Sequence, residues 1–160
     1  MNTGGVAAFG APYSMKMLEI DAVGMYDTAA EEQGKIFVTT ELGGGGTSTA
    51  NTVGIARRGA ANVLRHAGIL SGEPEPAPTR WLDMPSGDCF TFAEHDGLME
   101  PLVDLGMPVE QGDVVARIHR VDRTGADVVD LRAGLSGILA ARHFPGLVKA
   151  GDCAAVVGTV

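Results

Sequence analysis

The sequence predicts an α/β unit followed by a β-rich unit, and three observations carry this prediction. An apolar run at residues 35–40 stops at Glu41 and is followed by four glycines, which is typical of a buried strand that leads into an open loop. Residues 71–79 contain three prolines and are typical of an extended linker. Beyond this linker, a Gly-Asp turn followed by an alternating apolar strand occurs twice.

The elements of the first unit follow in order from these signals. Residues 15–21 read as a short strand, and Thr28 can cap a brief helix that ends at Gly34. The strand at 35–40 then completes a compact β-α-β arrangement. An acid at the C-terminal end of a buried strand is a usual position for an active-site group, so Glu41 is a candidate catalytic residue. A strand-end glutamate that pairs with a surface Lys or Arg is the alternative.

A longer helix follows the glycine run. Thr47 or Ser48 can cap it, and Gly68 stops it after Ala67. One face is expected to lie on a sheet and carries Val53, Ala56, Ala60, Val63, Leu64 and Ala67. The arginines at 57, 58 and 65 lie mostly on other faces. We expect a solvated polar face there, while a role of Arg57 or Arg58 in binding a substrate carboxylate stays open.

The second unit is predicted to contain short strands separated by Gly, Pro and Asp turns. They are expected at 88–94, 97–103, 113–121, 128–132, 137–142 and 152–158. The stretch 108–118 matches 147–157, and Gly97 and Gly106 match Gly137 and Gly146. Two such halves resemble a barrel-sandwich of the biotinyl/lipoyl type, whose carrier function needs a lysine between the halves. Residues 122–132 contain none.

Composition restricts the function further. The net charge of −8 argues against nucleic acid or an anionic membrane as the main partner. The two cysteines, Cys89 and Cys153, lie in apolar runs without metal-ligand spacing, which indicates buried thiols in a reducing cytoplasm. The first ten residues have no signal-peptide pattern, and no window reaches the roughly 20 apolar residues of a membrane span.

Several separate sequence blocks are familiar. They are Gly10–Met17, Thr39–Thr47, Arg57–Gly59, Arg80–Met84 and His143–Val148. Together they resemble the C-terminal half of the succinylglutamate desuccinylase/aspartoacylase family of zinc amidohydrolases. Within it, the likeness is closest to the N-alpha-acetyl-diaminobutyrate deacetylases of bacterial ectoine degradation. The resemblance implies the C-terminal part of a zinc-carboxypeptidase-like α/β domain with a β-rich appendage.

The resemblance also implies a chemistry: hydrolysis that removes an acyl (acetyl) group from an N-acylated amino acid. Glu41 occupies the place of the family glutamate that acts as general base and acid. In the family a His-x-x-Glu pair and a later histidine hold the zinc, all upstream of that glutamate. This chain has no histidine before Glu41 and no His-x-x-Glu, so its histidines, His66, His95, His119 and His143, are most simply structural. We name no metal ligand.

We therefore expect a partial α/β catalytic domain at 1–70, a linker at 71–79 and a barrel-sandwich-like domain at 80–160. Zinc belongs to the complete family enzyme, and no cofactor is expected to be held by this chain alone. The expected partners are an N-acyl amino-acid substrate and either the missing zinc-binding half or a second copy of the chain, without nucleic acid or membrane. A non-catalytic binding or regulatory module built on the barrel-sandwich is the alternative, so enzymatic activity of this chain stays open. The side chains that bind substrate stay unknown.

Overall fold

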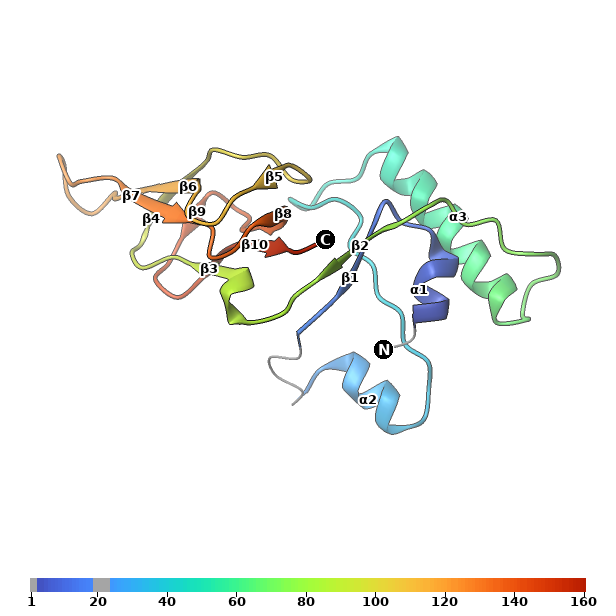
Figure 1. The fold of residues 1–160 in the computed structure, drawn as a ribbon. Helices are drawn as coiled ribbons and strands as arrows, with labels where there is room; N and C mark the ends of the chain where they lie inside the picture. The colour runs from blue at the N-terminus through green and yellow to red at the C-terminus, as the bar shows by residue number, and fades with distance from the viewer. Residues whose placement is uncertain (1–2, 19–23) are drawn as a thin grey trace. The chain divides into compact units, whose positions relative to one another are not determined.

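The computed structural model describes residues 3–18 and 24–160, and the chain divides into two compact units. The first comprises Met1–Trp81 and the second comprises Leu82–Val160. Figure 1 shows helices in the first unit and short strands in the second. Among the described residues, no helix has the length and apolar character that a membrane span requires.

The first unit is built mainly from helices. Its elements are α1 (Thr3–Phe9), β1 (Tyr13–Lys16), α2 (Tyr26–Glu32), α3 (Ala50–His66) and the start of β2 (Arg80–Asp83). β1 and β2 form a two-stranded sheet, and the backbone N–H of Arg80 donates to the carbonyl of Pro12 at 3.0 Å. α1 packs on α3, where the ring of Phe9 lies against Gly59 in the space that a Cβ would occupy. Sequence analysis did not predict α1.

The long helix α3 begins one or two residues later than predicted, since Thr47 or Ser48 was the expected cap. Thr49 is its N-cap: the Thr49 hydroxyl accepts from the Thr52 N–H at 3.1 Å, and the Thr52 hydroxyl accepts from the Thr49 N–H at 2.9 Å. This reciprocal pair satisfies N–H groups that have no partner within the helix. At the other end, Gly68 has a φ of +70° and its N–H donates to the Arg65 carbonyl, so the predicted stop is confirmed.

Thr49→Ala is expected to destabilise the first turn of α3 by about 0.5–2 kcal/mol, because the cap hydroxyl is lost. Ser48→Ala is the matched control, since Thr49 and not Ser48 caps the helix. Amide hydrogen exchange in the first turn of α3 measures the effect. Equal acceleration in both variants would contradict the assignment of Thr49 as the cap.

The buried face of α3 differs from the predicted one. The buried residues of this helix are Gly59 and Asn62, whereas Val53 and Leu64, on the face expected to lie on a sheet, are 47% and 41% exposed. The reason is that α3 contacts α1, and the two-stranded β1–β2 sheet does not cover its apolar side chains. An apolar stripe of α3 is therefore left open within this unit.

The strand predicted at residues 35–40 is wrong. This segment forms neither strand nor helix, and Ile36 is 76% exposed. A buried strand needs neighbouring strands that pair with its backbone, and among the described residues of the first unit no strand pairs with this segment. The strand predicted at 15–21 is β1, which ends at Lys16, and residues 19–21 lie outside the described residues. The brief helix is confirmed as α2, which starts at Tyr26 rather than after Thr28.

The second unit consists of two four-stranded sheets. Its strands are β3 (Phe90–Phe92), β4 (Gly97–Pro101), β5 (Pro108–Val109), β6 (Val114–His119), β7 (Val129–Arg132), β8 (Gly137–Arg142), β9 (Leu147–Val148) and β10 (Cys153–Gly158), with a 3₁₀ turn at Gly87–Cys89. One sheet has the order β3-β10-β8-β5 and the other has the order β7-β6-β4-β9. Each of the six predicted strands contains an observed one, and β5 and β9 are additional.

The sequence repeat reappears in the strand pairing. β4 pairs with β6 of its own half and with β9 of the other half, while β8 pairs with β10 and with β5. The registers match: Gly97 faces Val148 in one sheet, and Gly137 faces Val109 in the other. Each half therefore contributes a short strand to the sheet of its counterpart.

The two Gly-Asp turns have the same geometry. The Asp113 carboxylate accepts from the Glu110 N–H at 2.9 Å, and the Asp152 carboxylate accepts from the Lys149 N–H at 2.8 Å. The glycines that precede them, Gly112 and Gly151, have φ values of +91° and +93°, which favour glycine. The repeated dipeptide thus encodes one turn twice.

The hydrophobic core of the second unit is also duplicated. One cluster consists of Ala93, Met99, Ala116, Ile118, Leu131, Val148 and Ala154; the other consists of Val109, Val115, Ala133, Leu139, Ala155 and Val157. Each member of the smaller cluster has its counterpart from the repeat in the larger one. Both clusters lie in this unit, so the β-rich part carries most of the buried apolar side chains of the described chain.

Candidate functional site

Glu41 lies in an open segment between two parts of the first unit. Its side chain is exposed, and it follows the irregular residues 35–40 rather than a strand. The glycines after it form a turn in which the N–H and hydroxyl of Thr47 both donate to the Gly44 carbonyl, at 3.2 and 2.9 Å. Gly43, with a φ of +94°, lies against Thr52 in the first turn of α3. The glycine loop therefore contacts the first turn of α3, and Glu41, two residues before Gly43, stays exposed.

The four histidines do not gather into a metal site. His119 Nε2 lies 2.8 Å from Glu100 Oε2, and His143 Nε2 lies 3.8 Å from Asp152 Oδ2, so each histidine faces one carboxylate. The Asp96 carboxylate beside His95 accepts from the Ala150 N–H at 2.8 Å and holds a turn. Among the described residues, no group of three His, Cys, Asp or Glu side chains could hold a metal ion.

The two tyrosines lie on different elements. Tyr26, at the start of α2, is 79% exposed and makes an edge-to-face contact with Phe37, with ring centroids 5.4 Å apart. Tyr13 begins β1 and is 42% exposed. Lys16 is the last residue of the same strand and lies within the strand predicted at residues 15–21. Neither tyrosine hydroxyl forms a hydrogen bond with a described residue, and the structure gives no functional role to Tyr13 or Tyr26.

The cysteines are poor nucleophiles. Cys89 is fully buried, and burial raises the pKa of the half-buried Cys153 thiol, which donates weakly to the Ala155 carbonyl. A raised pKa keeps the thiol protonated at neutral pH, and the thiolate is the reactive form. The prediction that both thiols are buried is thus confirmed for Cys89 and only partly for Cys153.

Native Cys153 is therefore expected to react with iodoacetamide several-fold more slowly than the same residue in the unfolded chain at pH 7.5. The rate should rise as the pH increases through the usual range of a thiol pKa and beyond, because the folded pKa is raised. Mass spectrometry of the alkylated peptides provides the rates. Equal rates in native and unfolded protein would contradict the raised pKa.

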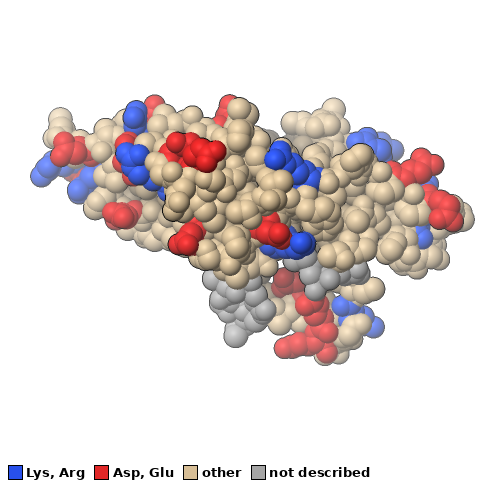
Figure 2. All heavy atoms as spheres, in the orientation of Figure 1, with Lys and Arg blue, Asp and Glu red and all other residues tan. Residues whose placement is uncertain are grey.

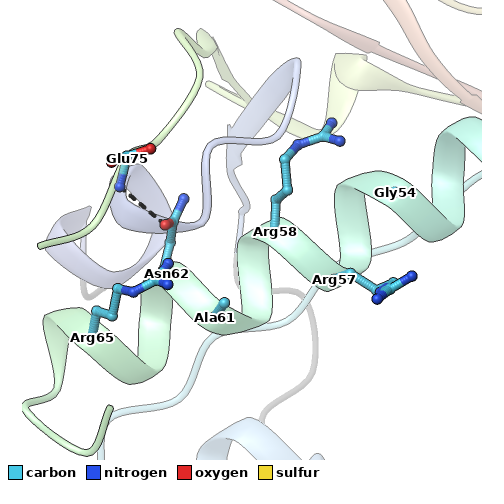
Figure 3. A pocket seen from close by; sticks show the side chains of 7 residues that line it. All are labelled: Gly54, Arg57, Arg58, Ala61, Asn62, Arg65 and Glu75. Carbon is cyan, nitrogen blue, oxygen red and sulfur yellow. Dashed lines mark hydrogen bonds between the residues drawn. The ribbon is translucent and has the colours of Figure 1, made fainter. Parts of the chain in front are cut away.

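Charged side chains of both signs are mixed over the surface drawn in Figure 2. One concentration of a single sign is found on α3. Arg57, Arg58 and Arg65, together with Asn62, line a pocket of about 430 Å³ that is completed by Gly54, Ala61 and Glu75 (Figure 3). The predicted solvated polar face is thus a hollowed surface. Asn62 was not predicted from the sequence; its only signal is an amide in the second half of α3, among apolar and basic residues.

Comparison with known proteins places this geometry in a family. Residues 5–67 match the catalytic domain of the succinylglutamate desuccinylase/aspartoacylase family. Over 158 residues, which is 98% of the chain, the sequence is 50% identical to the N-alpha-acetyl-L-2,4-diaminobutyric acid deacetylase of Halomonas elongata. The chain belongs to the succinylglutamate desuccinylase/aspartoacylase family. The family match includes Glu41, the glycine loop and all of α3.

Two solved structures share the fold of this chain. The product-bound ectoine utilization protein EutE (DoeB) from Ruegeria pomeroyi has a TM-score of 0.93 and 56% identity, over 98% of this chain and 48% of that one. A succinylglutamate desuccinylase from Silicibacter sp. TM1040 has a TM-score of 0.87 and 59% identity, over 97% of this chain and 47% of that one. This chain thus spans about half the length of the relatives it matches, and in the Halomonas protein it corresponds to the C-terminal half.

Proposed function

We propose that this chain is the C-terminal portion of a zinc-dependent amidohydrolase that removes an acetyl group from an N-acylated amino acid. The observation that carries the proposal is the 50% identity to the Halomonas deacetylase across almost the whole chain. The 0.93 TM-score with a protein of ectoine utilization supports the same substrate class. An N-alpha-acetylated diaminobutyric acid is accordingly the substrate to test.

Within this reaction, Glu41 acts as general base and then as general acid. Its carboxylate accepts a proton from water as the water oxygen attacks the amide carbonyl carbon. The same proton passes to the nitrogen when the C–N bond breaks, which yields a carboxylic acid and a free amine. The exposed side chain and the glycine turn beside it give a substrate room to approach. Zinc, when bound by the complete enzyme, supplies a polarised carbonyl and an acidified water.

The residues that the structure describes do not fit a zinc ion. A catalytic zinc site needs about three protein ligands and an open position. The described residues offer no such group, and His119 and His143 each face a single carboxylate in the β-rich unit. The ligands therefore come from polypeptide outside this chain, and the chain alone does not hydrolyse the amide efficiently.

Exposed apolar side chains in the first unit support the proposal that the chain is one part of a larger enzyme. Val53 and Leu64 on α3, Tyr26 on α2 and Ile36 before Glu41 are all more than two-fifths exposed. Ala8 is the one apolar residue with a buried side chain among the described residues of this unit before residue 80. Such surface is covered when a further part of the protein, or a second copy, packs on it.

We also propose a specific fold type and domain boundaries for the chain. The two sheets related by the repeat form a barrel-sandwich of the biotinyl/lipoyl type at residues 80–160. In the sequence this domain follows a partial catalytic domain at 1–70 and a linker at 71–79. The exchanged strands β5 and β9 and the duplicated core support this architecture. The division of the chain after Trp81 supports a boundary at the end of the linker.

Reconstitution tests the function. The chain alone should hold no stoichiometric zinc and show no turnover of N-alpha-acetyl-L-2,4-diaminobutyric acid. Co-expression with the N-terminal half of the Halomonas deacetylase should yield a complex that contains zinc and hydrolyses this substrate. A zinc-containing complex without turnover would contradict the proposal and favour a non-catalytic binding role. Turnover by the chain alone would contradict its incompleteness.

A further inference from the structure

The pocket on α3 combines positive charge with open volume. Arg58, Asn62 and Arg65 follow one another at intervals of four and three residues, so they share one face of the helix. Arg57 lies beside them, and the pocket of about 430 Å³ lies over the small residues Gly54 and Ala61. A Cβ added at Gly54 would lie 3.3 Å from Arg58 Nη1, so the missing side chain gives this guanidinium its position.

Asn62 points its amide into this pocket. The side chain is only 3% exposed, and its Oδ1 accepts from the Glu75 N–H at 3.0 Å. The Glu75 N–H can only donate, so the amide atom that faces it must be the oxygen Oδ1 and the other must be the nitrogen Nδ2. Figure 3 shows Nδ2 on the side away from this hydrogen bond. No acceptor for Nδ2 is found among the described residues, and Nδ2 is not fully enclosed, so this donor is open to the pocket.

The arginines of α3 also lack partners. The helix contains no Asp or Glu, and none of its three arginines forms an ion pair with the described residues. In the β-rich unit, by contrast, Arg117, Arg120 and Arg132 lie within 3.1 Å of an aspartate. In an acidic protein with a net charge of −8, an unpaired arginine cluster is an exception.

We propose that this pocket binds a small dianion, such as phosphate or a dicarboxylate. Guanidinium groups bind such oxyanions through paired, charge-assisted hydrogen bonds, and the Asn62 amide adds a neutral donor. Three arginines and one carboxylate, that of Glu75, line the pocket, so the lining has two excess positive charges to match a dianion. Arg58 and Arg65 share the face that carries Asn62, and the Glu75 N–H holds the Asn62 amide in place.

Titration of the ¹⁵N-labelled 160-residue chain tests the proposal, with inorganic phosphate and succinate as separate probes at constant ionic strength. Saturable shifts are expected for the Asn62 side-chain amide and for α3. A lower Kd for phosphate identifies a phosphate site, and a lower Kd for succinate identifies a carboxylate site. Either result supports the shared oxyanion chemistry. The absence of saturable shifts in α3 with both probes would overturn it.

Matched variants distinguish specific binding in the pocket from non-specific attraction of anions to positive charge. Arg58→Gln and Arg65→Gln should each raise the Kd on the order of tenfold, because each removes a charge-assisted contact. Ala61→Leu keeps every charge but fills the space, and it should weaken binding similarly at little cost to the helix. Arg123→Gln, in the β-rich unit, removes the same charge from a residue that does not line the pocket. If Arg123→Gln weakens binding as much as Arg58→Gln, or Ala61→Leu leaves it unchanged, the pocket is not the site.

Discussion

Replacing Glu41 by glutamine is expected to lower kcat by about 10²–10⁴-fold in the complex of this chain with the zinc-binding half of a relative. The amide of glutamine has nearly the size of the carboxylate but cannot accept the proton of water. The substrate is not held by this proton transfer, so KM and zinc content should change little. Steady-state kinetics on N-alpha-acetyl-L-2,4-diaminobutyric acid, with metal analysis of the same samples, measures all three quantities.

Glu32→Gln is the matched control for this result, since Glu32 is an exposed acid at the end of α2, nine residues before Glu41. It should retain the original kcat. Loss of zinc in Glu41→Gln would show that the side chain holds the metal instead of moving a proton. A kcat close to that of the unchanged complex would contradict the catalytic role. It would favour the alternative from the sequence, in which Glu41 is a surface residue that pairs with a Lys or Arg.

Ile118→Ala is expected to destabilise the β-rich unit by about 2–5 kcal/mol, which is a large part of the stability of a small domain. Ile118 is completely buried in the larger core cluster. Shortening it removes apolar contacts and leaves a cavity that the surrounding strands fill only in part. Urea unfolding followed by circular dichroism gives the change in the free energy of unfolding.

The repeat makes this result checkable at a second position. Val157 occupies the place of Ile118 in the other half and is 1% exposed, so Val157→Ala should destabilise the same cooperative transition. The loss should be smaller by roughly 0.8 kcal/mol, for the one methylene fewer that is removed. Val121→Ala, at a residue 67% exposed, is the control. Two separate transitions in either core variant would contradict a single interlocked unit.

The β-rich unit could be predicted well because its signals are local. A Gly-Asp turn needs a glycine with positive φ and a carboxylate that accepts from a nearby N–H, and both repeats carry these residues in the same order. The alternating apolar residues then define the strands. The exchange of β5 and β9 could not be predicted, because two-residue strands have no pattern of their own and depend on distant partners.

The first unit was predicted less well because its signals are those of buried elements, and the described residues of this unit leave these elements exposed. Residues 35–40 have the composition of a buried strand, and Val53 and Leu64 have the spacing of a helix laid on a sheet. Ile36, Val53 and Leu64 are more than two-fifths exposed, so the pattern and the structure differ at these places. The helix cap shows the opposite case: Thr49 and Thr52 decide it locally, and the prediction erred by one or two residues.

For the candidate site, sequence and structure contributed different parts. The resemblance of Thr39–Thr47 to the family pointed to Glu41, which no contact in the first unit would have identified. The pocket on α3 required the structure, because Asn62 and Glu75 come together only through the return of the linker over the helix. Arg58 and Arg65 were visible in the sequence, but their lack of acidic partners was not.

The exchange of β5 and β9 also bears on the origin of the β-rich unit. One repeat alone holds a pair of long antiparallel strands whose sheet lacks the two strands supplied by its counterpart, which are β7 and β9 in one sheet and β3 and β5 in the other. A peptide of one repeat could complete that sheet by pairing with a second copy of itself, in a symmetric dimer in which each copy gives and receives the same two strands. Duplication and fusion of such an ancestor would join two subunits into one chain, and the linking segment between β6 and β7 would be the seam.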